Sequence, residues 1–404
     1  MIIGFDAKRA FNNFTGLGNY SRTLIETLAK YYPENEYHLF TPKKIDHPRL
    51  DFIQSYPSVS VHFPTGFMRK IHPLWRSYFI SDDISREKID IFHGLSHELP
   101  LKIPKNVKTV VTIHDLIHEH YPQFYPIIDR KIYSWKFKSA CEKADVVVAI
   151  SEATKQDIMH FYKIEESKIK VIYQSCHPQF HTSVLPISAQ KDNDFHLPNS
   201  TRSDNDPLLP RSTRSDNILN KNKHNLPENY VLYVGTVNER KNLLGLVKSL
   251  QMIDNQLDIK LVVIGDGGDY LKKVKNYILE NQMESRVLFL SNIPFSDFPS
   301  IYKQAKALVL PSFQEGFGIP IIEALWSGCP IITSEGGCFP EAGGPDSIYI
   351  NPHDSEAIAH AIERVVTDAS LRERMILRGG EYVRKFHEQR IGEEWERLYR
   401  SLLR

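Results

Sequence analysis

The chain has 404 residues, more than one hydrophobic core usually supports, so its length predicts two domains of about 180 residues each. Hydrophobic residues make up 41% and charged residues 25%, which is typical of a soluble globular protein and not of a disordered chain. The 50 Lys and Arg residues almost balance the 49 Asp and Glu residues. Because no overall positive charge exists, nucleic-acid binding is not expected, and any basic site must be local.

The cysteines and the N-terminus indicate a cellular compartment. Cys141, Cys176, Cys329 and Cys338 are widely spaced and form no C-x-x-C pair, which favours reduced thiols. The N-terminal apolar run, residues 2–6, is too short for a secretory signal, and no run approaches the roughly 18 apolar residues that span a bilayer. We therefore expect a cytoplasmic protein whose only membrane contact would be peripheral, at the inner membrane face.

The first part of the chain alternates short apolar runs with helical patterns, which predicts a parallel sheet with helices on both faces. Helices are expected from the glycines at 16 and 18 onward, over 128–141, and over 152–162, where Ser151 is a good N-cap. The aromatic and basic stretch 71–78 is expected to pack in the core, with an acceptor groove or contact with a lipid headgroup region as the alternatives. Strands are expected over residues 2–6, 38–40, 59–61, 89–92, 107–113, 144–150 and 168–172.

Two places in this part offer binding groups. Gly16 and Gly18 open a helix, so their backbone amides suit an anion, although a plain tight turn is the alternative. His114 follows the strand 107–113 at its carboxyl end, where open α/β sheets bind ligands. A structural histidine is the alternative there.

Residues 185–226 are polar and lack apolar periodicity, and they carry a short direct repeat. Ser200–Asn205 has the same sequence as Ser212–Asn217. Neither copy could bury a core, so we predict a solvated insertion beside an interdomain linker, with a binding role as the alternative. The predicted domains are therefore residues 1–180 and 227–387, the latter followed by a final helix over 388–404.

The second part repeats the strand and helix alternation. Two adjacent cations, Arg240 and Lys241, follow a strand and Gly235, which suits a diphosphate because guanidinium binds oxygens in a fork and ammonium acts as a point charge. A solvated charge pair is the alternative. Strands are expected over 230–234, 261–264, 287–290, 307–310, 330–333 and 347–350, and helices over 243–250, 320–326, 355–367, 371–386 and 389–403.

The stretch 315–323 lies between two apolar strands and is built to hold an anion. Gly316 and Gly318 permit unusual backbone angles and close approach, and a helix beginning near Pro320 aims its amides and dipole at one point. Glu315 and Glu323 can face the same pocket, where carboxylates accept hydrogen bonds from sugar or ribose hydroxyls. The alternative is a solvated loop acid and a first-turn acid that favours the helix dipole.

These motifs together resemble the retaining glycosyltransferases of the GT-B fold, family 4 (group 1). The resemblance is carried by the E-x7-E pair of 315–323 and by the stretches 234–242, 263–267 and 112–115, in the family's order. It covers nearly the whole chain outside 185–226, and Trp326 departs from it, since the family mostly has a small residue there. It implies an α/β fold of two Rossmann-like domains with parallel sheets facing across a cleft, and a last helix that returns to the first domain.

The resemblance also implies a function: transfer of a hexose from a nucleotide-diphosphate sugar to a hydroxyl of a glycan or lipid-linked acceptor, with retention, in surface polysaccharide or lipopolysaccharide synthesis. GDP-mannose is favoured, because the residues after His114 are similar to those of mannosyltransferases. No D-x-D motif appears where a metal ion could be expected to neutralise the leaving diphosphate, so we predict that catalysis requires no metal and no other cofactor. A nucleotide-sugar epimerase of the same fold and a non-catalytic nucleotide-sugar binding protein are the alternatives.

The expected site residues fall into two sets. The catalytic set is His114, Arg240, Lys241 and Glu315; the donor-binding set is Gly16, Gly18, Gly235, Gly316, Phe317, Gly318, Ile319 and Glu323.

Overall fold

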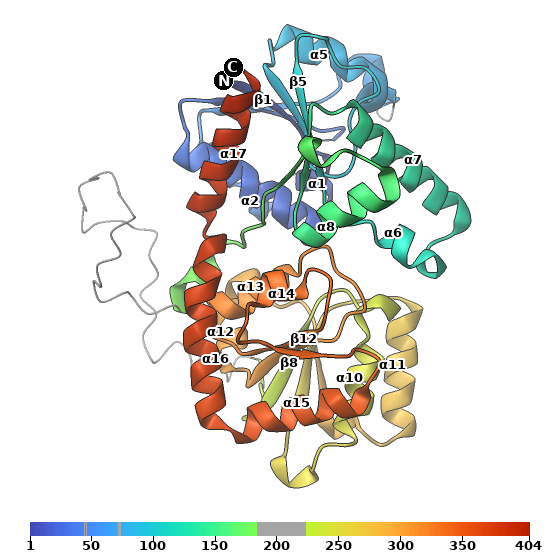
Figure 1. Ribbon diagram of the computed structural model, residues 1–404, viewed down its shortest axis with the longest axis vertical. Coiled ribbons are helices and arrows are strands. Elements are labelled where there is room, and N and C mark those ends of the chain that lie inside the picture. The colour runs from blue at the N-terminus through green and yellow to red at the C-terminus, as the bar shows by residue number, and fades with distance from the viewer. Residues whose placement is uncertain (44, 46, 72–73, 184–223) are drawn as a thin grey trace, which may run out of the picture.

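The computed structural model describes all residues except 44, 46, 72–73 and 184–223. It contains two α/β units, one above the other in Figure 1, each built on a parallel sheet. The fold class predicted from the sequence is therefore confirmed. Most of the predicted insertion, residues 185–226, lies outside the described residues.

The first unit is a seven-stranded sheet in the order β3-β2-β1-β4-β5-β6-β7, with all pairs parallel. Its strands are β1 (Ile2–Asp6), β2 (Glu36–Phe40), β3 (Val59–His62), β4 (Ile91–Gly94), β5 (Lys108–Ile113), β6 (Val146–Ala149) and β7 (Ile169–Val171). Its helices are α1 (Lys8–Asn12), α2 (Gly16–Tyr31), α3 (Phe52–Ser55), α5 (Ile80–Arg86), α6 (Ile117–His120), α7 (Ile127–Lys143) and α8 (Glu152–Asp157). Helix α8 is capped by Ser151, whose side chain accepts from the Thr154 amide, as expected.

The second unit is a six-stranded parallel sheet in the order β10-β9-β8-β11-β12-β13. Inside this sheet, Leu308 of β11 lies opposite Ile331 of β12, and every residue of these two strands is buried, which explains their unbroken apolar sequences. The strands are β8 (Tyr230–Val234), β9 (Lys260–Ile264), β10 (Val287–Leu290), β11 (Ala307–Leu310), β12 (Ile331–Ser334) and β13 (Ile348–Ile350). The helices are α10 (Leu243–Leu250), α11 (Asp269–Glu280), α12 (Phe298–Gln304), α13 (Ile319–Trp326), α14 (Phe339–Gly343), α15 (Ser355–Thr367) and α16 (Ala369–Tyr382).

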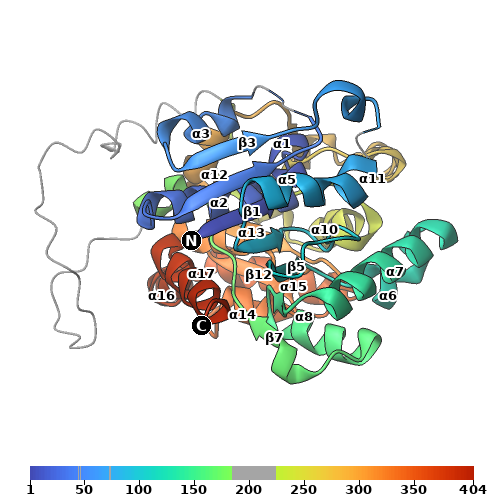
Figure 2. The same ribbon diagram turned by 90° about the horizontal axis from the view of Figure 1, so that it is seen from above.

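The last helix, α17 (Glu388–Leu402), returns the chain to the first unit. It follows α16 along one side of the molecule and brings the C-terminus close to the N-terminus, as Figures 1 and 2 show. Trp395 and Tyr399 are fully buried among the core residues of the first sheet, and the Tyr399 hydroxyl lies 2.7 Å from Nδ1 of His93. The two units are thus linked by two crossings of the chain.

Direct contacts also join the units beside the interface. The Ser151 hydroxyl donates to the Gly316 carbonyl at 3.0 Å. The Glu341 carboxylate accepts the first two amides of α8, from Glu152 at 2.7 Å and from Ala153 at 2.9 Å. A carboxylate from the second unit therefore caps a helix of the first, which stabilises the closed arrangement of the two units.

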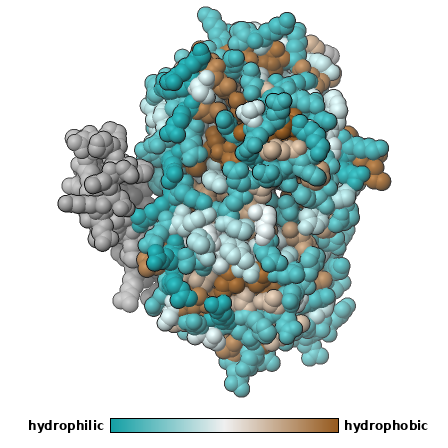
Figure 3. All heavy atoms as spheres, in the orientation of Figure 1, coloured by the Kyte–Doolittle hydropathy of each residue, from teal (hydrophilic) through white to brown (hydrophobic). Residues whose placement is uncertain are grey.

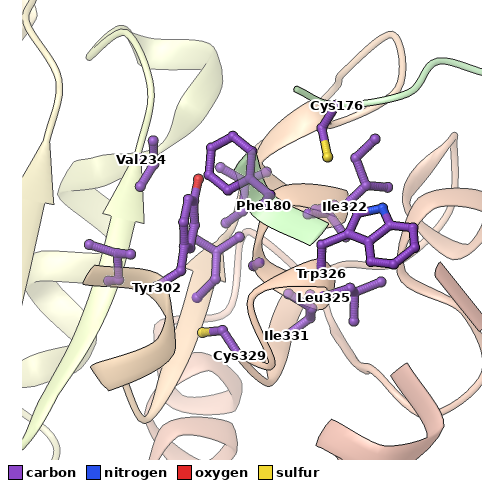
Figure 4. Close-up of a cluster of buried hydrophobic side chains, with 14 of the residues drawn as sticks. Cys176, Phe180, Val234, Tyr302, Ile322, Leu325, Trp326, Cys329 and Ile331 are labelled. Atoms are coloured by element: carbon purple, nitrogen blue, oxygen red, sulfur yellow. The ribbon is translucent and has the colours of Figure 1, made fainter. Parts of the chain in front are cut away.

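Two expectations about packing need comment. In the stretch 71–78, of which 72–73 lie outside the described residues, Trp75 is buried and Arg76 is paired with two carboxylates, but Tyr78 is 49% exposed. The core prediction is therefore wrong for Tyr78. Trp326, where the chain departs from the family that it resembles, is buried in the same core cluster as Cys176 and Phe180 of the segment that follows β7 (Figure 4).

Candidate functional site

A cavity of about 770 Å³ lies between the carboxyl ends of the two sheets. The first unit contributes the start of α2 and the residues after β5, and the second contributes the ends of β8 and β9 and the start of α13. All the predicted site residues except Gly18 line it: Gly16, His114, Gly235, Arg240, Lys241, Glu315, Gly316, Phe317, Gly318, Ile319 and Glu323.

The corner before α13 has the geometry that the sequence predicts for an anion site. Gly318 adopts a left-handed conformation, with φ of 95°, as the residue preceding α13, and Pro320 lies in the first turn of that helix. The amides at the start of α13 therefore point toward the cavity side of the loop with the positive end of the helix dipole. Such an arrangement attracts phosphate oxygens.

The close approach at Gly316 is to protein and not to a ligand. A Cβ at this position would lie 2.1 Å from the His114 carbonyl oxygen, so no larger residue fits. Gly316 thus lets the loop of the second unit touch the end of β5 in the first. A glycine was predicted here because a close approach needs the space. The group that approaches is the His114 backbone of the first unit.

Glu315 is the centre of a buried ion cluster. One carboxylate oxygen lies 2.7 Å from Nζ of Lys241, and the other lies 3.0 Å from Nη1 of Arg240. Burial alone would raise the pKa of Glu315, but the charges of Arg240 and Lys241 outweigh it and lower the pKa to about 2. Glu315 is therefore an anion at neutral pH, and its side chain is only 11% exposed.

This cluster changes two expectations. A solvated loop acid was the alternative for Glu315, and this alternative is wrong, because Arg240 and Lys241 enclose its side chain. The two cations were expected to be free for a diphosphate, but with Glu315 between them the cluster carries only one net positive charge. A bound diphosphate would have to compete with Glu315 for both cations.

Gly235 provides the space for this cluster. Its φ is 139°, in the region that favours glycine, and a Cβ would lie 3.1 Å from Nζ of Lys241. A side chain at this position would be strained by this φ and would crowd the end of the Lys241 side chain.

Glu323 is a second buried carboxylate, and its pKa is raised, whereas the pKa of Glu315 is lowered. Its Oε2 accepts from the Tyr302 hydroxyl at 2.9 Å, and the residue is 8% exposed. Burial raises the pKa of Glu323 to about 7, partly offset by the Tyr302 hydrogen bond and by Arg49. At neutral pH this group is divided between carboxylate and carboxylic acid, so it can accept or donate a hydrogen bond at a ligand hydroxyl.

His114 lies at the cavity as a neutral imidazole. Its Nε2 lies 2.9 Å from the Leu95 carbonyl, to which it must donate, and its Nδ1 lies 3.1 Å from the Gln174 amide nitrogen, from which it accepts. Burial, together with His97, lowers the pKa of His114 to about 3. Both ring nitrogens are engaged, so the side chain cannot move a proton without losing one of these bonds.

The position of Gly18 does not support the role in donor binding that was predicted for it, because this residue does not line the cavity. A Cβ there would lie 1.6 Å from the Asn13 carbonyl oxygen, and its amide donates to the Asn13 side chain at 3.3 Å. Gly18 is thus needed for the tight packing of α2 on the preceding turn. Gly16, at the first position of α2, lines the cavity as predicted and has open space around it.

Arg49 lines the cavity, although no sequence pattern selects it as a site residue. Its guanidinium lies over the ring of Phe295 in the second unit, 4.2 Å from the centroid, and its Nη1 donates to the Asn19 side chain at 3.1 Å. It reaches the cavity from the connection after β2, which carries no glycine or helix signal. Only its position in space identifies it.

The part of the chain that the structure describes brings possible metal ligands together away from the cavity. Two groups of His and Glu side chains there could hold a metal ion, His38 with His62 and Glu87, and His181 with His387 and Glu388. Neither group lines the cavity. Within the same residues, every helix is too short or too polar to cross a membrane.

Comparison with known proteins accounts for both halves of the chain. Residues 14–179 match the family described as "Glycosyltransferase Family 4", and residues 214–381 match "Glycosyl transferases group 1". The first match contains the α2 start and His114, and the second contains Arg240, Lys241 and Glu315.

Similar proteins include two bacterial O-antigen chain mannosyltransferases. The O-antigen chain mannosyltransferase B of Escherichia coli is 25% identical over 397 residues, covering 92% of this chain and 92% of that protein. The O-antigen chain mannosyltransferase RfbU of Salmonella typhimurium is 26% identical over 263 residues, covering 65% of this chain and 62% of that protein.

Solved structures show the same fold over the full length. Sucrose-phosphate synthase from Thermosynechococcus elongatus superposes with a TM-score of 0.74 at 21% identity, covering 100% of this chain and 99% of that one. HepE from Anabaena, solved with UDP and glucose, has a TM-score of 0.72 at 17% identity, covering 99% and 100%. The fold is therefore GT-B. With both halves matched by family and the cleft formed between them, the chain belongs to the family 4 (group 1) glycosyltransferases, retaining enzymes that transfer a hexose from a nucleotide sugar.

Proposed function

We propose that this enzyme transfers mannose from GDP-mannose to a hydroxyl of a growing surface polysaccharide or of a lipid-linked precursor. The observation that carries the proposal is the similarity to the Escherichia coli O-antigen chain mannosyltransferase B, which extends over 92% of both chains. That protein's name supplies both the sugar and the class of acceptor.

The cavity suggests where each part of the donor binds. The diphosphate would bind between Arg240 and Lys241 and the amides at the start of α13, the only place where these cations and a helix N-terminus meet in the described cavity wall. The Tyr302 hydroxyl holds Oε2 of Glu323, so Oε1 of this carboxylate, whose pKa is about 7, would accept a hydrogen bond from a ribose hydroxyl. The sugar would then extend toward Glu315 and His114.

The chemistry requires stabilisation of the leaving diphosphate. When the bond between the anomeric carbon and the β-phosphate oxygen breaks, negative charge collects on the diphosphate, and preorganised cations stabilise that charge most. As a diphosphate binds, Arg240 and Lys241 would exchange part of their contact with Glu315 for phosphate oxygens. Glu315 would then be free to accept a sugar hydroxyl, so one rearrangement prepares both halves of the donor. No metal is assigned a role in this step.

The surface of α7 suggests how a lipid-linked acceptor is approached. Ile127 and Ile128 are 67% and 73% exposed, and Trp135 on the same helix is 58% exposed. Apolar side chains gather at the right-hand edge of the upper unit, where α7 begins (Figure 3). Exposed lysines, Lys131 and Lys138, accompany them. This combination suits peripheral contact of a cytoplasmic enzyme with the anionic inner face of a membrane.

The proposal is tested by screening nucleotide sugars for transfer and for thermal stabilisation. GDP-mannose should stabilise the enzyme more than UDP-glucose, UDP-galactose or GDP-fucose, and should alone give product with a lipid-linked glycan acceptor. Transfer from a UDP-sugar with none from GDP-mannose would contradict the proposed donor while leaving the family assignment in place.

A further inference from the structure

A cluster of two histidines and a buried glutamate lies where the chain crosses between the two units. His181 belongs to a 3₁₀ turn, Pro178–Ser183, on the path from β7 to the second sheet. His387 and Glu388 lie at the start of α17, where the chain returns to the first unit. Residues more than 200 positions apart on the two crossings thus meet at one point.

The three side chains converge on a single oxygen. Oε2 of Glu388 lies 3.1 Å from Nδ1 of His181 and 3.4 Å from Nδ1 of His387. The Glu388 side chain is 5% exposed, and its Oε2 has no hydrogen-bond partner of suitable geometry among the described residues. Three ligand atoms bound to zinc at about 2.0–2.1 Å in a tetrahedron would be roughly 3.3 Å apart, close to the two distances found.

The surrounding contacts orient these ligands. The Tyr31 hydroxyl of α2 donates to Oε1 of Glu388 at 3.0 Å, which leaves Oε2 facing the histidines. On His181, Nε2 lies 3.9 Å from the sulfur of Cys176, so Nδ1 is the nitrogen that faces Glu388. Outer contacts of this kind, which hold the other atom of each ligand, are typical of metal sites.

We propose that His181, His387 and Glu388 form a binding site for a divalent transition-metal ion of the zinc type, which ties together the two crossings between the units. Imidazole nitrogens and carboxylate oxygens are both common ligands of zinc in proteins. The site is separate from the donor cavity, so the ion would stabilise the arrangement of the units and would not take part in transfer.

A protonated histidine is the competing explanation. One proton on His181 would form an ion pair with Oε2 at 3.1 Å, and Lys30 adds a second positive charge 3.9 Å from Oε1. A proton on His181, however, joins only two of the three atoms and gives His387 no bond to Oε2 of Glu388. A metal ion satisfies all three, at the cost of the weak 3.3 Å hydrogen bond that His387 accepts from the Gln389 amide.

A second group of two histidines and a glutamate, which lies in the first unit, provides a matched control for the proposed metal site. His38, His62 and Glu87 also come together, at the edge of the first sheet. There Nδ1 of His38 lies 2.9 Å from Nε2 of His62, the distance of a hydrogen bond between two imidazoles, and Glu87 is 3.8 Å from each ring. That pair is satisfied without a metal ion.

The experiment uses the full chain, stripped with a chelator and titrated with Zn²⁺ by calorimetry and thermal unfolding. The wild type should bind one zinc per chain and gain several degrees in Tm at zinc concentrations far above Kd. His387→Asn, which keeps a good N-cap for α17, should lose that gain, and Tyr31→Phe should weaken zinc binding by roughly 10–100-fold. His62→Asn should keep the full response.

Co²⁺ in place of zinc adds a spectroscopic measurement that does not depend on stability. The wild type and His62→Asn should show the visible bands of four-coordinate Co²⁺, and His387→Asn should not. A stripped wild type whose Tm is unchanged by zinc would overturn the proposal. So would a zinc response that survives in His387→Asn or disappears in His62→Asn.

Discussion

Replacing Glu315 with glutamine would remove the negative charge that Arg240 and Lys241 share. The change keeps the size of the side chain and leaves two cations close together in a site where Glu315 is only 11% exposed. The expected effect on stability follows from the pKa of Glu315, which these cations lower from the ordinary 4.5 to about 2. A shift of this size corresponds to about 3 kcal/mol.

The sign of the pH dependence follows from the direction of this shift. Because the folded-state pKa is depressed, the stabilisation is fully present above pH 4.5 and is lost as the pH falls toward 2. At pH 7, Glu315→Gln should therefore lower the free energy of unfolding by about 3 kcal/mol. An exposed control, Glu356→Gln in α15, should change it by less than about 0.5 kcal/mol.

Ligand binding separates this explanation from simple damage to the fold. If a diphosphate takes over the two cations, then GDP should raise the Tm of Glu315→Gln by more than it raises the Tm of the wild type, because Glu315 no longer competes. Transfer should still be largely lost, since the neutral amide has one acceptor oxygen in place of two and binds a sugar hydroxyl more weakly than a carboxylate does. Thermal unfolding with and without GDP measures the shift in Tm, and product formation measures the loss of transfer. A smaller GDP shift in Glu315→Gln than in the wild type would refute the proposed exchange of partners.

Three further predictions concern other parts of the enzyme. His114→Ala should lower kcat more than it lowers GDP affinity, because the ring lies toward the sugar; equal losses would indicate a purely structural histidine. The pKa of Glu323 is raised to about 7, so the folded state keeps a proton that the unfolded state has lost between pH 4.5 and 7, and stability from this group falls as the pH rises through that window. Unfolding measured against pH should therefore be flatter in that window for Glu323→Gln, and an unchanged slope would contradict the assignment. The polar sequence of residues 190–222 predicts a solvated loop, and shortening such a loop has a small entropic effect, so deleting these residues should leave transfer nearly unchanged; a large drop in rate at normal stability would mean that the segment reaches the acceptor.

Much of the fold follows from local sequence patterns. The strands β11 and β12 and the helix α13 between them were predictable because unbroken apolar runs, a left-handed glycine and an early proline all agree over residues 307–334. The Ser151 cap was predictable for the same reason, since capping depends on neighbouring residues only. In this region each local preference points to the structure that forms.

The contacts that shape the site are of another kind. Glu315 meets its cations across more than 70 residues, and Glu341 caps a helix almost 190 residues earlier in the chain. Gly18 and Gly316 both looked like ligand-facing glycines, yet each makes room for a protein carbonyl. Sequence shows that a small residue is present but not which atom occupies the space beside it, so the motif was identified and the partners were not.

The most direct test of the account is the effect of Arg240 on kcat compared with its effect on donor affinity. Arg240→Ala should lower kcat for transfer from GDP-mannose by roughly 100- to 1,000-fold, with a smaller loss of GDP affinity, and Arg240→Lys should lie between it and the wild type. The assay should be run with EDTA in the His387→Asn background, so that any ion bound at the crossings does not affect the result, and added Mg²⁺ should restore nothing. Equal losses of kcat and affinity in Arg240→Ala, or activity that vanishes with EDTA and returns with a divalent ion in that background, would contradict the claim that the protein's own cations stabilise the leaving diphosphate.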